Sequence, residues 1–260
     1  MESKTAAGEV LGVREVIAEA GKAELSAETF SDVSAAIYSA DSGVSELKEI
    51  LEDWDGFTKS FDSATVANVL KGYLKYVLTD LAGAEEILRR EKRNEWGYCY
   101  FIRATVGLGR LEEAAELVKD ARSRFPSSES LLFLAIEVAC RSRRTEDAAK
   151  LLEKASDRAG ASAAYAHHQA LCLEAAGEYR EAIEWYRRAA EREPEHAEAL
   201  FRLGYLLDIY GEGDATDEAI EAYERCLKIT PVHANAVVNL GVLYEDRERY
   251  HDAGKCFETV

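Results

Sequence analysis

The sequence has few of the residues that interrupt helices, cross membranes or link extracellular domains. It contains 3 Pro in 260 residues, which favours long helices, and no stretch approaches the ~20 apolar residues of a transmembrane helix. Its 5 Cys never form a C-x-x-C pair, and the N-terminal segment lacks the apolar run of a signal peptide. These absences predict a helical protein of the cytoplasm whose thiols stay reduced.

Basic side chains are also scarce. The chain has 32 Lys+Arg against 49 Asp+Glu, for a formal net charge of -17, and its two ends are more acidic than its middle. A protein that binds a phosphate backbone needs a basic face, so we expect no direct binding to nucleic acid. Acidic helix faces are usually only solvated; a preference for basic partners is the alternative, and the sequence leaves both open.

Motifs for catalysis and metal binding are missing as well. There is no Gly-rich phosphate loop, no G-x-S-x-G and no H-E-x-x-H. His167 and His168 are the only adjacent histidines, and neighbouring side chains on a helix point about 100° apart, so the two cannot share one metal without other ligands. We therefore expect no catalytic residue, no metal and no cofactor.

What the sequence does have is a repeat with a period of 34 residues. Small residues at positions 8 and 20 would lie where two helices cross. Glycine at position 15, as at Gly109, Gly177 and Gly211, accepts the left-handed backbone that ends a helix, and proline at 32 starts the next turn. The pattern recurs in the blocks 95–128, 129–162, 163–196, 197–233 and, incomplete, 234–260.

This pattern resembles the tetratricopeptide repeat (TPR) family. The residues that carry the resemblance in one block are Leu203, Gly204, Gly211, Ala219, Tyr223 and Pro231. The resemblance covers residues 95–260 and implies an all-α fold, a right-handed superhelical solenoid of antiparallel helix pairs, the TPR array. It also implies a protein-binding scaffold rather than an enzyme.

The pattern fades upstream without vanishing. Residues 61–94 are predicted to form a degenerate TPR with Gly72, Ala84 and Leu88 at positions 8, 20 and 24 and a helix break near Thr79. Residues 1–60 are predicted to form an N-terminal helical cap, in which Ser26 starts one helix and a second apolar stripe runs from Val44 to Trp54. Residues 1–24 either add a helix around Val10 to Ala20 or are partly disordered.

The resemblance also implies which side chains face the concave groove, namely positions 2, 5, 6 and 9 of each first helix. The candidate partner-binding residues are Trp96, Tyr100, Arg103, Phe133, Glu137, His167, His168, Phe201, Arg202, Tyr205 and Asn239. Neither the chaperone-tail clamp nor the asparagine ladder of other TPR proteins fits them. We expect a partner helix or extended segment with apolar or aromatic anchors and some basic character. Alternatively, some of the aromatics pack against the chain's own N-terminal helices.

Two other functions stay open at this stage. The chain stops at Val260 inside a repeat, which predicts a truncated protein, and residues 239–250 are similar to the last repeat of bacterial TPR proteins that also carry a domain like the C-terminal domain of the RNA polymerase α subunit. The chain would then be a non-catalytic regulatory or spacer arm of a longer, transcription-associated protein. The other possibility is self-association through the uncapped last repeat. The insertion Gly211–Asp217 is predicted to be a surface loop.

Overall fold

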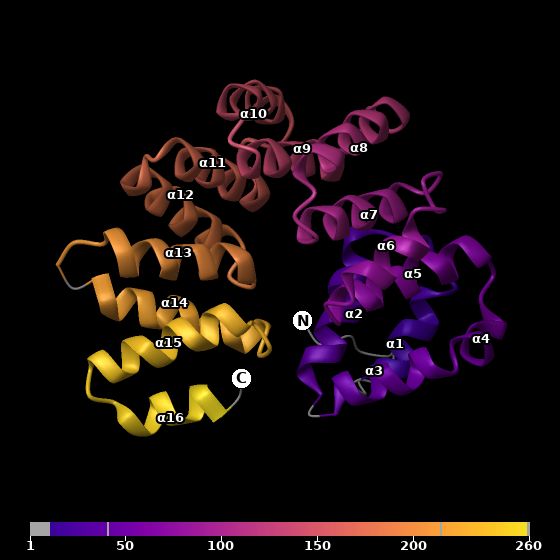
Figure 1. The fold of residues 1–260 in the computed structure, drawn as a ribbon, viewed down its shortest axis with the longest axis horizontal. Coiled ribbons are helices and arrows are strands. Elements are labelled where there is room, and N and C mark those ends of the chain that lie inside the picture. The colour runs from indigo at the N-terminus through magenta and orange to yellow at the C-terminus, as the bar shows by residue number, and fades with distance from the viewer. Residues whose placement is uncertain (1–10, 41, 214, 259–260) are drawn as a thin grey trace. The chain divides into compact units, whose positions relative to one another are not determined.

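The computed structural model describes residues 11–40, 42–213 and 215–258, and within them it contains sixteen α-helices and no strand (Figure 1). The predicted all-α class is therefore confirmed. The helices form two compact units, 1–131 and 132–260. This division does not coincide with the predicted domain boundaries at residues 60 and 94. In a repeat array each helix pair contacts mainly its neighbours, so changes in sequence pattern need not be changes in packing.

The first unit holds the N-terminal helices and the first repeats. Its helices are α1 (Val13–Ala20), α2 (Ala27–Ser39), α3 (Gly43–Glu52), α4 (Trp54–Phe57), a 3₁₀ turn (Thr58–Ser60), α5 (Ala64–Val77), α6 (Leu81–Leu88), α7 (Glu95–Gly107) and α8 (Leu111–Arg124). The predicted cap of α2 is confirmed, because the Ser26 hydroxyl accepts a hydrogen bond from the Thr29 amide. The predicted helix before Ala20 is confirmed as α1, and residues 1–10 lie outside the described residues.

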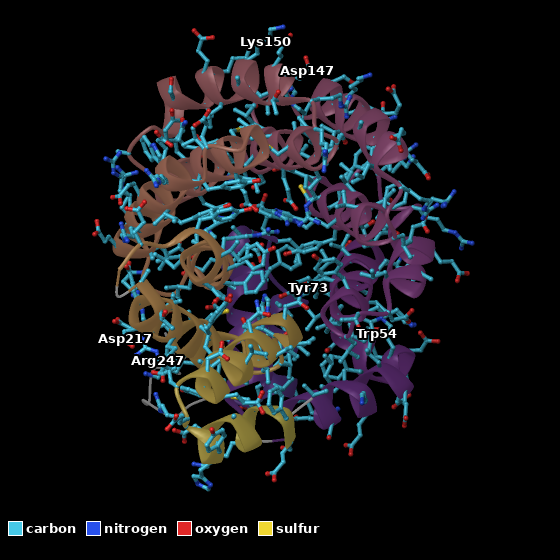
Figure 2. All side chains as sticks on the ribbon, turned by 60° about the vertical axis from the view of Figure 1, so that its left-hand side comes forward. Trp54, Tyr73, Asp147, Lys150, Asp217 and Arg247 are labelled. Carbon is cyan, nitrogen blue, oxygen red and sulfur yellow. The ribbon has the colours of Figure 1, made fainter. Side chains whose placement is uncertain are left out.

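An aromatic and aliphatic core holds this unit together. Its apolar stripe on α2 is buried as predicted, and Trp54 is 4% exposed. The ring of Tyr73, on α5, packs edge-on against Phe30, on α2, with ring centroids 4.7 Å apart. The Tyr73 hydroxyl also donates a hydrogen bond of 2.7 Å to the Phe30 carbonyl oxygen. Figure 2 labels Tyr73 and Trp54 among the side chains of this unit. The N-terminal helices thus share one core with the first repeat.

The predicted close crossing of paired helices is visible between α5 and α6. A Cβ atom on Gly72 would lie 2.4 Å from Cγ of Leu88, which is fully buried, so only glycine fits there. The same contact recurs in a later repeat, where a Cβ atom on Gly204 would lie 3.0 Å from the ring of Tyr223. Position 8 therefore faces position 24 of the same repeat, and the residue at position 8 limits how closely the two helices approach.

The second unit consists of consecutive helix pairs. Its helices are the greater part of α9 (Glu129–Arg141), α10 (Thr145–Ala159), α11 (Ala163–Ala176), α12 (Tyr179–Arg192), α13 (Ala197–Tyr210), α14 (Ala215–Ile229), α15 (Ala234–Asp246) and α16 (Tyr250–Glu258). Tyr186 and Tyr223 are fully buried in its core, which runs from α11 to α16. We call the first helix of each pair the inner helix, so α9, α11, α13 and α15 are the inner helices of this unit.

Each turn inside these helix pairs contains a residue with a left-handed backbone, but that residue is not always glycine. Gly109 and Gly177 have the predicted left-handed backbone, with φ of 77° and 86°. Gly211 does not: its φ is -67°, because the insertion lengthens the turn, and the left-handed residue there is Gly213. Three other turns use a residue with a side chain at this point. They are at Thr79 (φ 61°), Arg143 (φ 56°) and Glu248 (φ 58°).

Candidate functional site

Three of the predicted groove residues are rings covered by a histidine that lies on, or caps, the next inner helix. Phe133 and Phe201 occupy position 5 of α9 and α13, and His167 occupies the same position of α11. Each is less than 10% exposed. In each case an imidazole lies against the ring, with centroid separations of 4.6 Å for Phe133–His168, 4.8 Å for His167–His196 and 4.4 Å for Phe201–His233. The expectation that these three residues are open to a partner is corrected: they connect consecutive repeats.

The side chains of Trp96 and Tyr100 also pack against other side chains of the same chain. Their rings lie 5.3 Å and 4.8 Å from the ring of Phe30 on α2, and both pack against the core of the first unit. This is the alternative that the sequence left open for some of the aromatics. Arg103, one turn further along α7, is half-buried, and its charge acts on Cys99 and Tyr100. We therefore leave the α7 residues out of the candidate site.

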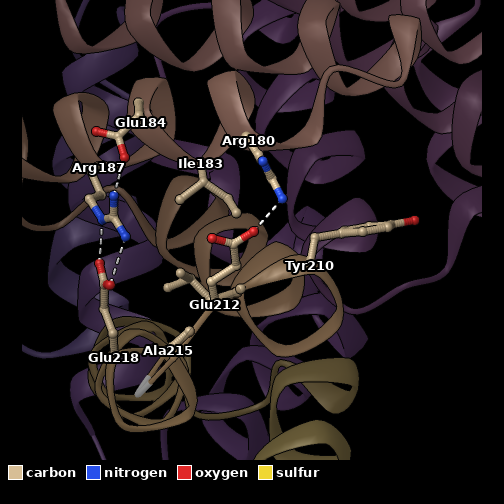
Figure 3. Close-up of a pocket in the computed structure, with 10 residues that line it drawn as sticks. Arg180, Ile183, Glu184, Arg187, Tyr210, Glu212, Ala215 and Glu218 are labelled. Carbon is tan, nitrogen blue, oxygen red and sulfur yellow. Dashed lines mark hydrogen bonds and ion pairs between the residues drawn. The ribbon is translucent and has the colours of Figure 1, made fainter.

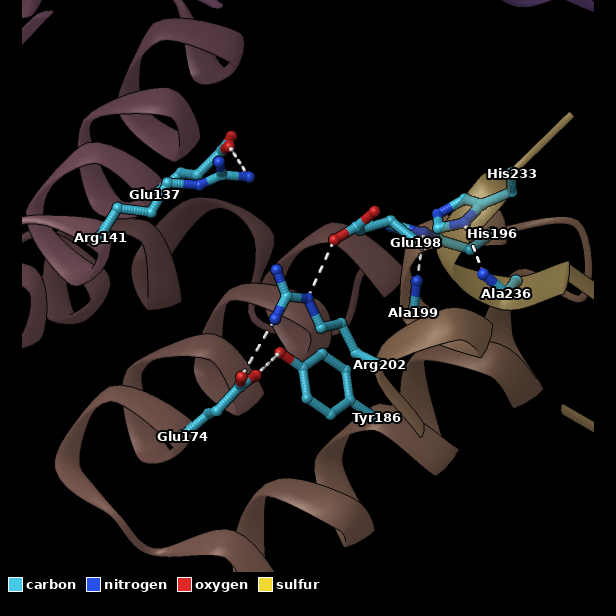
Figure 4. Close-up of polar contacts among 10 residues, drawn as sticks. All are labelled: Glu137, Arg141, Glu174, Tyr186, His196, Glu198, Ala199, Arg202, His233 and Ala236. Atoms are coloured by element: carbon cyan, nitrogen blue, oxygen red, sulfur yellow. Dashed lines mark hydrogen bonds and ion pairs between the residues drawn. The ribbon is translucent and has the colours of Figure 1, made fainter. Parts of the chain in front are cut away.

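Arg202 lies in a network of charged side chains between α11 and α13 (Figure 4). Its Nη1 lies 3.1 Å from Glu174 Oε1, and its Nε lies 3.0 Å from Glu198 Oε1. The other oxygen of Glu174 accepts a hydrogen bond of 2.8 Å from the buried Tyr186 hydroxyl. Burial alone would lower the pKa of Arg202, but the two carboxylates outweigh it and raise that pKa. Arg202 thus holds two inner helices together.

Glu137, another predicted groove residue, is paired within its own helix. One of its carboxylate oxygens lies 3.0 Å from Arg141 Nη2, on α9 (Figure 4). His168 is likewise engaged locally, since its Nδ1 lies 2.7 Å from the Ala164 carbonyl oxygen. These contacts leave the predicted residues at the C-terminal end of the array as the better candidates.

Two imidazoles cap the inner helices α13 and α15. His196 Nδ1 accepts a hydrogen bond of 3.3 Å from the Ala199 amide, and His233 Nδ1 accepts one of 3.2 Å from the Ala236 amide (Figure 4). An Nδ1 that accepts a hydrogen bond carries no proton, so the caps need neutral imidazoles. Burial lowers the pKa of His196 below its ordinary value of 6.5, against the opposing charges of Glu193 and Glu198. The fold therefore favours the neutral ring.

We expect the stability of the protein to fall as the pH drops below about 6.5, partly through His196. The unfolded chain binds a proton at its ordinary pKa, whereas the folded chain binds it only at lower pH, so acid favours unfolding. His196→Asn keeps a capping side chain that does not titrate, so this variant should lose less stability than wild type between pH 7.5 and 5.5. Urea unfolding at both pH values measures this. His251→Asn, at an exposed histidine, is the control, and an equal acid loss in wild type and His196→Asn would contradict the prediction.

Of the large apolar side chains that the structure describes as exposed in the second unit, five lie on α13 and α15, whereas Val232, Tyr250 and Phe257 lie outside these helices. Tyr205 and Ile209 on α13 are 36% and 49% exposed, and Val238 and Val242 on α15 are 40% and 45% exposed. Tyr205 is one of the predicted groove residues. Asn239, another, is half-buried, and its Nδ2 donates a hydrogen bond of 3.0 Å to the Tyr223 hydroxyl. Apolar groups that stay exposed to water on consecutive inner helices are typical of a binding surface.

Two carboxylates accompany these apolar residues. Burial raises the pKa of Asp208 on α13, and the negative charge of Asp246 on α15 raises it further. Asp208 and Tyr205 also act electrostatically on Tyr223, the residue that Asn239 contacts. Among the described residues, no basic side chain pairs with Asp208 or Asp246. We call the set Tyr205, Asp208, Ile209, Val238, Val242 and Asp246 the α13–α15 face.

Of the six residues of this face, only Tyr205 is among the candidate partner-binding residues predicted from the sequence. Ile209, Asp208 and Asp246 stand at positions 12 and 13 of their repeats, beyond the positions that the resemblance assigns to the groove. Their signal was present in the sequence, because each lies one turn of helix after a predicted groove position and so on the same side of the helix. Val238 and Val242 occupy groove positions but were passed over in favour of aromatic and polar neighbours.

The other candidate surface is a pocket that lies mainly on the outer helices α12 and α14 and includes residues of the insertion (Figure 3). Its volume is about 420 Å³, and it is lined by Arg180, Ile183, Glu184, Arg187, Leu207, Tyr210, Gly211, Glu212, Ala215 and Glu218. Each charged side chain of its lining already has a partner: Arg187 contacts Glu218 and Glu184, and Arg180 contacts Glu212. Because these charges are engaged with one another, the α13–α15 face is the better candidate.

Neither a metal centre nor a membrane span is found in the part of the chain that the structure describes. Within residues 11–40, 42–213 and 215–258, no three His, Cys, Asp or Glu side chains are grouped as metal ligands. Every helix in those ranges is also too short or too polar to cross a bilayer.

Comparison with known proteins gives two kinds of likeness. The sequence pattern of the tetratricopeptide repeat matches residues 166–206, and a second pattern of the same repeat matches residues 101–164 and 208–259. These matches concern the repeats and not the RNA polymerase α resemblance, which stays a prediction. No curated protein matches the chain.

Among solved structures, the chain is similar to TTC0263, a thermophilic TPR protein of Thermus thermophilus, with a TM-score of 0.57 and 20% identity over 73% of this chain and 98% of that one. It is also similar to the structure of the APC/C hetero-tetramer Cut9–Hcn1, with a TM-score of 0.60 and 13% identity over 90% of this chain and 46% of that one. The likeness to MamA has a TM-score of 0.45 and 25% identity over 60% of this chain and 89% of that one. At such identities the likeness to TTC0263 and to Cut9–Hcn1 bears on the fold alone.

Proposed function

Because residues 101–164, 166–206 and 208–259 are tetratricopeptide repeats, we propose that this protein is a scaffold that binds a segment of a partner protein across its inner helices. Proteins of this family generally mediate protein–protein interactions and are typically not catalytic. The binding surface in the proposal is the α13–α15 face, as part of a concave groove, in a cytoplasmic protein.

The observation that carries the proposal is the combination of exposed apolar side chains with two carboxylates that lack a basic partner among the described residues. Apolar side chains of the partner would cover Tyr205, Ile209 and the two valines, which removes their surface from water. A lysine or arginine of the partner would lie between Asp208 and Asp246 and relieve their mutual repulsion. The partner segment is therefore amphipathic and basic, in agreement with the expected apolar anchors and basic character.

Selection from a library of random peptides displayed on phage tests this function. Wild-type protein should enrich peptides that place Lys or Arg one helical turn from two or more apolar residues. The double variant Asp208→Lys, Asp246→Lys should bind the selected peptides at least about tenfold more weakly, because like charges then oppose one another. Tyr205→Ala with Val242→Ala should weaken the same peptides by a similar factor while leaving the preference for basic residues in place.

A matched control separates the face from the overall charge. Glu181→Lys with Glu191→Lys makes the same change in net charge on the outer helix α12, where both glutamates are exposed. This control should bind the selected peptides as wild type does. The proposal is wrong if the Asp208 and Asp246 variant binds them equally well, or if the wild-type selection shows no preference for basic and apolar residues together.

A further inference from the structure

Two thiols face one another between consecutive inner helices. Cys140, near the end of α9, and Cys172, on α11, have their Sγ atoms 3.5 Å apart. Cys140 is 5% exposed and belongs to an apolar cluster with Ile136 and Leu171, whereas Cys172 is partly exposed. A disulfide bond is about 2.05 Å long, so a closure of about 1.5 Å would join them. A rotation of the two side chains with a small shift of the helices supplies such a distance.

We propose that Cys140 and Cys172 are a peroxide-reactive thiol pair that forms an intramolecular disulfide joining α9 to α11. This inference is independent of the proposed binding function. In the first step the Cys172 thiolate attacks an oxygen of hydrogen peroxide, an S–O bond forms, the O–O bond breaks and hydroxide leaves as water after protonation. Cys172 is then a sulfenic acid. In the second step the Cys140 sulfur attacks the sulfur of Cys172, the S–S bond forms, the S–O bond of the sulfenic acid breaks, and its hydroxyl group leaves as a second water with the Cys140 proton.

The assignment of roles follows from the surroundings of the two sulfurs. The hydrogen bond from Cys140 lowers the pKa of the Cys172 thiol, against the effect of burial, which favours Cys172 as the attacking thiolate. The same contact, burial and the nearby charges of Glu137 and Glu174 raise the pKa of Cys140, so it keeps its proton until the second step. Cys172 is also the more exposed of the two, so peroxide reaches it first.

The remaining thiols are expected to be unreactive. Burial raises the pKa of Cys99 to about 12, and it raises that of Cys226 to about 12. Burial also raises the pKa of Cys256. A thiol that stays protonated reacts slowly with peroxide in the first step, so these three cysteines serve as internal controls in the same molecule.

Peptide mapping of the peroxide-treated full chain by mass spectrometry tests the inference. Wild type should yield a cross-linked pair of peptides containing Cys140 and Cys172, with unmodified Cys99 and Cys226, and its melting temperature should rise by about 5–10 °C, because the bond closes a loop of 32 residues. Cys99→Ser should behave like wild type. Cys140→Ser should stop at the sulfenic acid, which dimedone traps on Cys172, at least about tenfold faster than on the other cysteines.

Peptide mapping of the wild type tests the inference even if the variants fail to fold. If serine in the apolar cluster impairs folding, Cys140→Ala replaces Cys140→Ser. Three outcomes would overturn the inference. Both thiols could stay reduced while an exposed model thiol is oxidised, the treated protein could contain only disulfides between molecules, or dimedone could label Cys99 or Cys226 as fast as Cys172.

Discussion

Arg202→Glu should lower the free energy of unfolding by about 3 kcal/mol, since it removes the cation between two carboxylates and adds a third. Glu174 is 17% exposed on its side chain and Arg202 is 25% exposed, so the charges at this point are poorly solvated. Glu198 is 44% exposed, which keeps the expected loss at the lower end of the values for broken buried ion pairs. Urea unfolding followed by circular dichroism measures the loss.

A thermodynamic cycle shows whether the charge network is the cause. Arg202→Met alone should cost about 2 kcal/mol, because it leaves Glu174 without its cation. Adding Glu174→Gln should recover part of that loss, since the glutamine still accepts the hydrogen bond of Tyr186 and needs no cation. If Arg202→Glu unfolds within about 0.5 kcal/mol of wild type, the network contributes little, and Arg202 is available to a partner as the sequence suggested.

Gly72→Val should cost about 3 kcal/mol through overpacking between α5 and α6. Even the first added carbon would lie 2.4 Å from Cγ of Leu88, whose side chain is fully buried and branched at that atom. Gly72→Ala should therefore also destabilise the protein, although alanine favours a helix over glycine by about 1 kcal/mol. Combining Gly72→Ala with Leu88→Ala should cost less than the sum of the two single changes, because the new methyl group fills part of the space that leucine leaves.

Gly254→Ala is the matched control for this effect. Gly254 also lies in a helix, but among the described residues no atom outside the backbone of that helix turn and the adjoining residues lies within 4 Å of the Cβ that alanine would add. At this position alanine's higher helix propensity is not opposed by a steric clash, so Gly254→Ala should stabilise the protein by up to about 1 kcal/mol. Thermal melting of both alanine variants makes the comparison, and a stabilised Gly72→Ala would show that the crossing of α5 and α6 can widen.

The fold was readable from the sequence because its main features are local. The period of 34 residues places small residues at helix crossings and ends each inner helix at a set point. The contact of Gly72 with Leu88 and the left-handed Gly177 are both where the pattern puts them. The left-handed turn at Arg143 was not readable, because the pattern expects glycine there. Two hydrogen bonds stabilise that turn, from the amides of residues 143 and 144 to the carbonyl oxygens of 140 and 139. They allow the left-handed conformation at a residue other than glycine.

The candidate site was only partly readable, because exposure depends on the neighbouring repeat. Position 5 of an inner helix carries a ring in three repeats, and rings at a groove position suggest anchors for a partner. In the structure the imidazole that caps the next inner helix covers His167 and Phe201, a contact between residues about 30 positions apart that no local pattern reveals. Arg202 was read as a binding residue for the same reason, since its carboxylate partner Glu174 comes from the previous repeat.

The contact of Phe30 with Trp96 and Tyr100 has a consequence for the order in which the chain folds. Most helices here pack on the helix just before or after them, and such local contacts form quickly. The ring of Phe30, on α2, meets α7 only after four intervening helices have been made. The entropy of closing that long segment must be lost before the aromatic contacts offset it. Helix pairs can thus form one after another along the chain, while the N-terminal helices must wait for α7 before their core is complete.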